Sequence, residues 1–305
     1  AGYILSKIGL PSRLPTHMED YPKSHGEFGV IFDLISIGIE ELFNLKDKKD
    51  IYTMRHQLNF TFYILGGLFF FLFSRKLFIR NIAVLSTLIY IINPRLFAHG
   101  FFNPKDSILQ SFVAIALYAI YNALTINKNR WFIVSGLISG ICIGTRIVMV
   151  YLPILFCFMV LLINYKSNMA SGLKRLKINI MQIGLYLIFV IIGLVVFWPT
   201  LWENPIKNFF WIFNMMKSFP ASISVLYMGE IITSKNLPWH YVPILITITT
   251  PILFFISFIY GLLNILIKPK IADILKNPIY LFSVLGIFIP IFSVIVLQSH
   301  LYDGW

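Results

Sequence analysis

The run "LNFTFYILGGLFFFLFS" at residues 58–74 decides the fold, because it carries no charged side chain and most of its residues are large and apolar. About 20 such residues cross a hydrocarbon layer about 30 Å thick as a helix. The basic stretch "RKLFIR" at residues 75–80 follows directly. Basic loops beside apolar runs are typical of the cytoplasmic side of a membrane. The run therefore predicts a transmembrane helix that ends in the cytoplasm.

The rest of the chain has the same character. Of its 305 residues 58% are hydrophobic and 12% are charged, whereas a soluble domain has about 25% charged residues. A water-soluble fold is therefore excluded. We predict an all-α polytopic membrane protein with about eight transmembrane helices, at residues 58–74, 82–94, 107–125, 131–145, 147–164, 178–197, 242–267 and 279–298. Residues 1–57 form a first extracytoplasmic loop, and 58–305 form the transmembrane domain with a long outer loop at 198–241.

The charged residues predict how the chain is oriented. Twelve of the 25 lysines and arginines lie in the short loops 75–80, 126–130, 165–177 and 268–277, which we place in the cytoplasm. The basic residues form no single patch, so nucleic-acid binding is excluded despite the net charge of +12. All six histidines and 12 of the 13 acidic residues fall on the opposite side. These are the side chains that proton transfer uses, so we expect the chemistry on the extracytoplasmic face. This orientation also leads us to expect a helix before residue 1 and more spans after residue 305.

The segment "GVIFDLISIGIEELFNL" at residues 29–45 predicts an interfacial helix. Asp33, Ser36, Glu40 and Asn44 recur at steps of three and four, which places them on one helical face. Such a helix lies flat on a membrane surface, with its acidic face in water.

The stretch "PRLFAHGFFNPKDSILQ" at residues 94–110 concentrates polar side chains between two apolar runs. It contains His99, Asn103, Lys105 and Asp106, and Asp106 opens a predicted span. An ionisable group at the membrane boundary indicates a functional site. The alternative is structural, because Asn103 or Asp106 can cap the helix that starts near residue 107.

Two further positions attract attention for their charge. Arg146, in "GTRIVMVYLP", has no charged neighbour in the sequence. Its guanidinium matches a phosphate, so we expect an anion there; the alternative is that it reaches up to lipid headgroups. Glu19 and Asp20 stand side by side in "THMEDYPKSHGEFG", ahead of the interfacial helix.

Six stretches, in order, resemble bacterial multi-pass glycosyltransferases of the C-type (GT-C) superfamily, close to the dolichyl-phosphate-mannose protein mannosyltransferases and similar to glycosyltransferase family 39. The resemblance covers residues 19–305, and "FFNPKDS" and "LPWHYVP" are its more specific parts. The stretches are "PRLFAHGFFNPKDS", "GTRIVMVYLP", "FWPTLWENP", "LYMGE", "LPWHYVPILITITTP" and "LYDGW".

The resemblance implies an integral enzyme of the bacterial inner membrane with its active site on the extracytoplasmic side. Its partners would be a polyprenyl-phosphate-sugar donor and a protein, glycan or lipid acceptor. In the superfamily a carboxylate of the first outer loop acts as the base, often as one of two adjacent acids; Glu19 and Asp20 match, and Asp20 is our choice. A second acid, at the start of a later span, matches Asp106.

Together, the residues and the resemblance give a mechanistic hypothesis. Asp20 accepts the proton of the acceptor hydroxyl. Arg146, with Lys105, neutralises the released phosphate. Asp106 and His99 hold the acceptor or the base, and a single displacement would invert the sugar carbon. Asn103, Glu203 and His240 are further candidates for substrate binding.

Two alternatives remain beside this hypothesis. A transporter or lipid-linked glycan flippase would have ionisable residues at the bilayer midplane and repeated halves, and neither is found in the sequence. A structural subunit would tolerate replacement of its outer carboxylates. The histidines make no H-x₃-H or H-E-x-x-H pattern, so no metal site or cofactor is predicted, although a divalent cation is left open.

Overall fold

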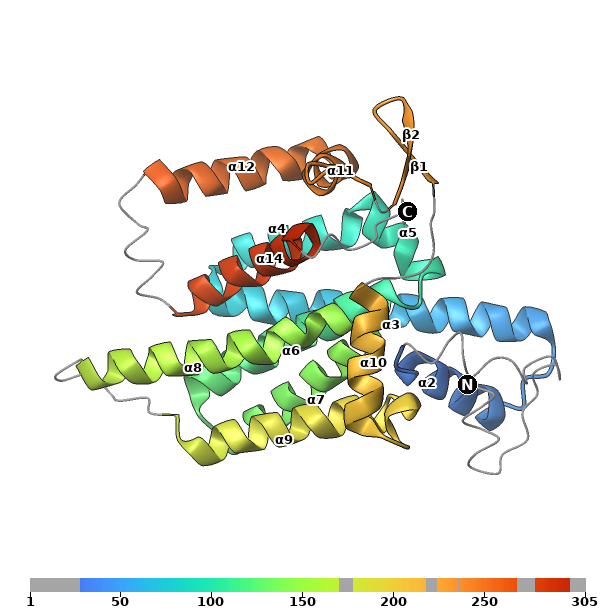
Figure 1. Ribbon diagram of the computed structural model, residues 1–305, viewed down its shortest axis with the longest axis horizontal. Coiled ribbons are helices and arrows are strands. Elements are labelled where there is room, and N and C mark those ends of the chain that lie inside the picture. The colour runs from blue at the N-terminus through green and yellow to red at the C-terminus, as the bar shows by residue number, and fades with distance from the viewer. Residues whose placement is uncertain (1–27, 170–177, 218–223, 235, 268–277, 297–305) are drawn as a thin grey trace.

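The computed structural model describes residues 28–169, 178–217, 224–234, 236–267 and 278–296. Long helices run beside one another along the molecule, as Figure 1 shows. The first of them are α3 (Lys48–Leu77), α4 (Arg80–Ile92), α6 (Asp106–Ile126), α7 (Asn129–Thr145), α8 (Tyr151–Met169) and α9 (Ile180–Val196). The start of α6 and the end of α7 meet at one end of this bundle, which we call the Asp106 end. The short helices α2 (Ile31–Leu42) and α5 (Pro94–Phe102) lie at the same end.

The predicted all-α membrane fold is confirmed in its main lines. Among the described residues, three helices are long and apolar enough to cross a membrane: α3, α6, and the segment 147–165 made of the 3₁₀ turn η2 (Ile147–Val150) and most of α8. The number rises to five if two bent pairs of helices are each counted as one span. The predicted total of eight spans remains a prediction.

Asparagine side chains mark several helix ends. Asn93 accepts hydrogen bonds from the backbone at the start of α5, where Pro94 occupies the first turn. Asn179 and Gln182 form a capping box at the start of α9. Asn127 ends α6 in the left-handed region, with φ 56°. These short polar residues divide an almost continuous apolar sequence into separate helices.

Helices α7 and α9 pack closely because glycines let their backbones approach. A Cβ atom at Gly140 would lie 2.2 Å from the Val190 carbonyl oxygen, and one at Gly193 would lie 2.2 Å from the Leu137 carbonyl oxygen. Small residues at helix contacts are a common packing device in membranes. The small-residue stretch of α7 is therefore a packing surface.

Two predicted helical segments end earlier than expected. The predicted span 242–267 is wrong as one helix: α11 (Tyr241–Thr249) and α12 (Ile252–Ile267) meet at a bend of 119°. Pro251 lies at the break, where it has no N–H to donate and holds Thr250 in an extended conformation. The predicted span 82–94 likewise ends at Ile92, and α4 bends by 58° into α5 at Asn93.

The interfacial helix is present as α2, but its polar face differs from the prediction. Asn44 lies beyond the helix, with φ 49°, so it does not share the face. Ser36 is buried and donates to the Phe32 carbonyl. The acids are paired rather than simply solvated: Glu40 Oε1 is 2.7 Å from Arg55 Nε, and Asp33 Oδ1 is 3.7 Å from Arg55 Nη1. Arg55 thus ties α2 to α3.

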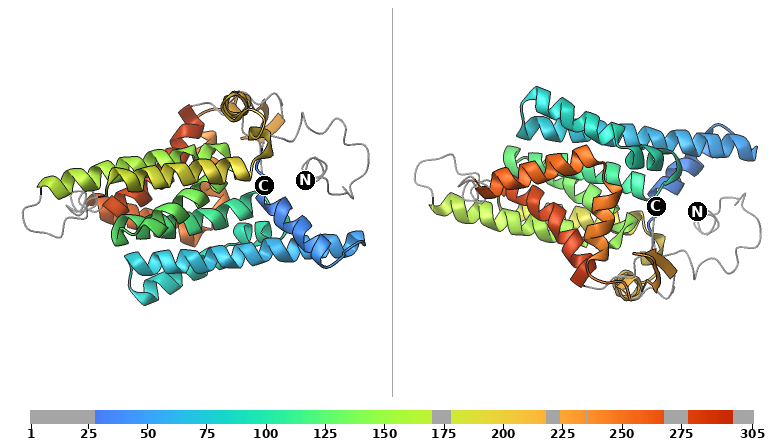
Figure 2. Two further views of the ribbon diagram at one scale, coloured as in Figure 1. Left: turned by 90° about the horizontal axis from the view of Figure 1, so that it is seen from below. Right: turned by 90° about the horizontal axis from the view of Figure 1, so that it is seen from above.

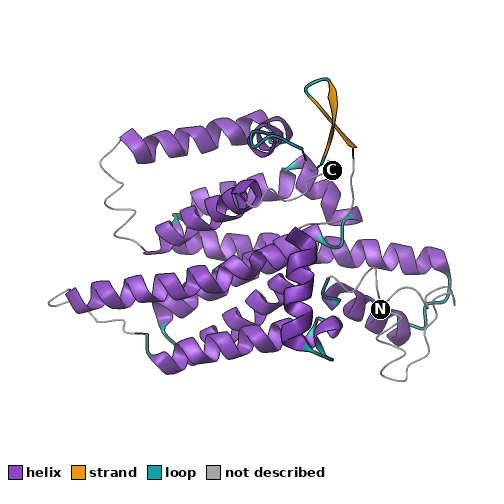
Figure 3. Ribbon diagram, viewed as in Figure 1, coloured by secondary structure: helices purple, strands orange, loops and turns teal. Residues whose placement is uncertain are grey.

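The segment 198–241 contains structure that the sequence analysis did not predict. After the short turn η3 (Pro199–Leu201), helix α10 (Pro205–Lys217) lies across the long helices, as Figures 1 and 2 show. Strands β1 (Ser224–Tyr227) and β2 (Glu230–Thr233) then form an antiparallel hairpin, the only strands among the described residues (Figure 3). The turn residues Met228 and Gly229 both have positive φ, as a two-residue hairpin turn requires. The fold is therefore nearly all-α.

A last helix, α14 (Pro278–Val296), packs against α8. Its side chains Leu281, Leu285 and Ile289 extend the hydrophobic core of the bundle. This packing leaves an open space near the Asp106 end of α8, which is described below.

Candidate active site

Asn103 organises the start of α6. Its side-chain oxygen accepts hydrogen bonds from the backbone N–H of Lys105 at 3.2 Å and of Asp106 at 3.0 Å. Of the two residues considered as caps, Asn103 therefore satisfies the free N–H groups, which leaves the Asp106 carboxylate for other partners.

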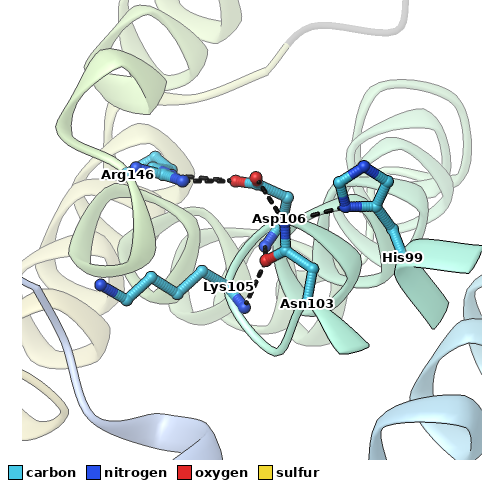
Figure 4. Close-up of polar contacts among 5 residues, drawn as sticks. All are labelled: His99, Asn103, Lys105, Asp106 and Arg146. Atoms are coloured by element: carbon cyan, nitrogen blue, oxygen red, sulfur yellow. Dashed lines mark hydrogen bonds and ion pairs between the residues drawn. The ribbon is translucent and has the colours of Figure 1, made fainter. Parts of the chain in front are cut away.

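Asp106 forms an ion pair with Arg146. Asp106 Oδ1 lies 2.6 Å from Arg146 Nη2 and 3.1 Å from its Nε, while Asp106 Oδ2 accepts from Asn103 Nδ2 at 2.9 Å (Figure 4). The side chains are 48% and 32% exposed, so both can be reached from outside. Each charge also interacts favourably with the dipole of its helix, because Asp106 lies in the first turn of α6 and Arg146 follows the last residue of α7.

Arg146 has no charged neighbour in the sequence, but the fold places one beside it. Forty residues separate Asp106 from Arg146 in the chain. They meet because α6 and α7 are consecutive antiparallel helices, so the start of one lies beside the end of the other. Asp106 is therefore an anionic partner of Arg146 within the chain, and a phosphate beside Arg146 stays a prediction.

His99 joins this cluster through Asn103. Its Nδ1 is 2.8 Å from Asn103 Nδ2 (Figure 4). The helix that carries it is held by α3, because Asn59 donates to the His99 carbonyl and His56 bonds the Phe101 carbonyl. We call His99, Asn103, Asp106 and Arg146 the polar cluster.

The first described residues lie directly against the polar cluster. The Phe28 ring has Lys105 Nζ 4.0 Å and Arg146 Cζ 5.4 Å from its centre, distances at which a ring attracts cations. Gly29 donates to the Gly144 carbonyl at 2.7 Å and Val30 to the Phe197 carbonyl at 2.9 Å. A Cβ at Gly29 would come within 2.9 Å of the Phe197 oxygen, so only glycine fits this crossing. Glu19 and Asp20 lie outside the described residues.

An apolar cavity of about 610 Å³ extends from Arg146 along α8. Arg146 and Phe28 line it, together with side chains from η2, α8, α10 and α14. Phe158 also lines it, seven residues beyond Tyr151, which places it about 10 Å farther along the helix. Of the described residues that line the cavity, only Arg146 is charged.

The comparison with known families can now be set beside this geometry. Residues 57–202 match the family described as dolichyl-phosphate-mannose-protein mannosyltransferase. This similarity supports a membrane glycosyltransferase of the GT-C type. The matched segment contains the whole polar cluster of this mannosyltransferase-like enzyme, whereas Phe28, α10 and α14 lie outside it. No curated protein and no solved structure matches the chain.

Two candidate residues of the glycosyltransferase lie in other surroundings. His240 Nδ1 is 2.6 Å from the Tyr227 hydroxyl, so its contact supports the hairpin. Glu203 lies exposed between η3 and α10 and does not line the cavity. Both follow a tryptophan in the sequence, and neither lines the cavity.

Metal ligation is the remaining possibility at the site. Within the described ranges, no group of three or more His, Cys, Asp or Glu side chains lies close enough to hold a metal ion. The described carboxylate of the site, Asp106, is instead shared between Arg146 and Asn103.

Sequence reasoning missed Phe28, Gly29 and Arg55. Phe28 is an aromatic residue in a polar stretch, and no pattern marks it as a neighbour of Lys105 and Arg146. The ion pair, in contrast, could have been predicted. Asp106 opens one span and Arg146 closes the next, so any antiparallel pair of helices brings them to the same end.

Proposed function

We propose that this glycosyltransferase moves a sugar from a polyprenyl-phosphate donor to an acceptor hydroxyl at the extracytoplasmic face. The observation that carries the proposal is the apolar cavity that ends at Arg146. An apolar groove with a single cation at its end suits a molecule that has a hydrocarbon tail and an anionic head.

The cavity supplies a place for the tail. Its volume of about 610 Å³ is that of a small-molecule site. Ile154 and Phe158 line one wall from α8, and Leu285 and Ile289 line another from α14. The wall from α8 is open, since Ile154 is 67% exposed and Phe158 is 44% exposed. A polyprenyl chain can therefore enter sideways from the bilayer.

Arg146 and Lys105 supply the cations for the head. A polyprenyl-phosphate sugar is a phosphodiester with one negative charge, whereas the released monoester carries about −1.5 to −2 at neutral pH. Cations beside the phosphate therefore stabilise the departing group more than the bound donor, which is the requirement for catalysis. Lys105 and Arg146 both face Phe28, which holds them on the same side of the site.

The displacement needs one base. The acceptor oxygen attacks the anomeric carbon, the bond from that carbon to the phosphate oxygen breaks, and its electron pair stays on the phosphate. The hydroxyl proton passes to a carboxylate, for which Asp20 remains our proposal and Glu19 its neighbour. General-base catalysis of this kind contributes about 10²–10⁴-fold. One such displacement inverts the configuration of the sugar carbon.

The test is to identify the lipid that copurifies with the full chain by mass spectrometry. We expect a polyprenyl-phosphate sugar, and we expect much less of it in Arg146→Gln than in Arg80→Gln, which removes a cation from the far end of the bundle. Copurification of other lipids only, or equal amounts of donor in both variants, would overturn the proposal.

A second test fills the cavity. Ile289→Trp places a bulky ring in the tail site, whereas Ile287→Trp on the same helix adds it at a position that is 51% exposed and does not line the cavity. Only the first should reduce the copurifying lipid while the protein still folds. The reaction itself is tested by Asp20→Asn, which should lose transfer by about 10²–10⁴-fold.

A further inference from the structure

The orientation of the Asn103 amide is fixed by its surroundings. Its oxygen accepts from the backbone N–H groups of Lys105 and Asp106, and its nitrogen donates to the Asp106 carboxylate. Rotating the amide by half a turn would point its oxygen at the carboxylate oxygen and its NH₂ at two N–H groups. Both changes replace attraction with repulsion, so the amide nitrogen is the atom that faces His99.

This orientation fixes the state of His99. Asn103 Nδ2 is a donor, and it lies 2.8 Å from His99 Nδ1. Nδ1 can accept this hydrogen bond only when it carries no proton, as in the neutral ring that has its proton on Nε2. Figure 4 shows His99 and Arg146 at opposite ends of the cluster, with Asn103 and Asp106 between them.

We infer that His99 is a positioning residue that works only when neutral, and that its protonation releases Asn103 and so switches the site off in acid. A proton on Nδ1 would place N–H groups of both side chains against each other. Asn103 must then turn away, and Asp106 Oδ2 loses its partner. Without Asn103 the carboxylate is held only through Oδ1 by Arg146.

Other charged groups lie around His99 and enter the argument. On α3, His56 bonds the backbone of α5 at Phe101. Arg95 shares helix α5 with His99, and Lys105 and Asp106 lie on the next segment. Arg146 is linked to His99 through Asp106 and Asn103, and the Asp106 carboxylate also interacts electrostatically with His99. Several of these groups can titrate or change the electrostatic potential at His99. A pH dependence alone therefore does not identify His99, and the test needs variants at position 99.

Two substitutions separate the roles of the ring. In His99→Asn, an amide oxygen replaces Nδ1 at nearly the same place and cannot be protonated in this pH range. In His99→Gln, the amide lies near the position of Nε2, so Asn103 loses its acceptor. His99→Asn should therefore keep the hydrogen bond that Asn103 donates, whereas His99→Gln should lose it.

The first measurement does not depend on the reaction. The full chain, labelled with ¹⁵N-histidine, is placed in lipid nanodiscs, and the signal missing from His99→Asn is assigned to His99. We expect an unprotonated Nδ1 and a protonated Nε2 at about pH 7.5, with Nδ1 gaining its proton as the sample is acidified through the range in which histidines titrate. A protonated Nδ1 at about pH 7.5 would overturn the inference.

The second measurement rests on the proposed function, because it follows sugar transfer from a polyprenyl-phosphate donor. Transfer by the unsubstituted protein should fall about tenfold for each pH unit on the acid side, as one proton requires. His99→Asn should be about tenfold more active than His99→Gln near neutral pH, as one hydrogen bond of about 1.4 kcal/mol predicts. In His99→Asn the acid decline should move to the lower pH range in which a carboxylate base such as Asp20 titrates. An unchanged acid decline in His99→Asn would overturn the inference. Absence of transfer in the unsubstituted protein would count against the proposed function, and the ¹⁵N measurement would still decide the role of His99.

Discussion

Two glycines of α9 give a matched test of how the bundle is packed. A Cβ atom at Gly193 would lie 2.2 Å from the Leu137 carbonyl oxygen, whereas one at Gly184 would meet nothing within 4 Å. Real Cβ atoms do not come closer than 3.0 Å. In Gly193→Ala, helices α7 and α9 must therefore separate by about 1 Å, and overpacking of this kind costs about 1–3 kcal/mol. In Gly184→Ala only the helix propensity changes, which favours alanine by about 0.5–1 kcal/mol.

The expected difference in stability between the two variants is thus the overpacking cost of about 1–3 kcal/mol, with Gly193→Ala the less stable. Thermal unfolding of the purified protein in one detergent measures it, as a midpoint several degrees lower for Gly193→Ala. Because both substitutions add the same methyl group to the same helix, general effects of alanine cancel. Equal midpoints, or a more stable Gly193→Ala, would refute the close contact of α7 with α9.

Two further predictions concern the site. A double-mutant cycle with Asp106→Asn and Arg146→Gln should give a coupling free energy of only about 0.5–1 kcal/mol in unfolding, because the pair is partly exposed; strictly additive effects would mean that the pair does not form. Gly29→Ala should displace the chain beside Phe197 and reduce transfer while the protein remains folded, whereas Gly38→Ala, which meets no neighbour, should leave transfer intact and make α2 more stable by about 0.5–1 kcal/mol. A Gly29→Ala variant with full activity would show that the Phe28 segment is not part of the site.

The apolar pattern predicted most of the helices, because the bilayer requires long apolar runs whatever the tertiary structure is. Residues 58–74, 107–125, 131–145 and 147–164 all fall on observed helices, and 178–197 extends past α9 by two residues at its start and one at its end. Asn103 was correctly considered as a cap, since capping depends only on a few neighbouring residues. Local rules of this kind need no knowledge of distant contacts.

The errors arose where distant parts of the chain meet. The pairing of Glu40 with Arg55 depends on how α2 returns to α3, and the span pattern contains no information on that. The hairpin lacks the asparagine–glycine turn that usually signals one, since Met228 occupies its first turn position. Pro251 was a usable signal for the break between α11 and α12, but the apolar residues on both sides obscured it.

The cavity is walled by segments that lie far apart in the chain. Arg146 and α8 belong to the part that matches the family, while α10 and α14 come from the part beyond residue 202. The polar cluster and part of the cavity wall therefore belong to different segments of the chain. A chimaera that exchanges the residues after 202 would keep the polar cluster unchanged while altering the shape and length of the apolar cavity beside it.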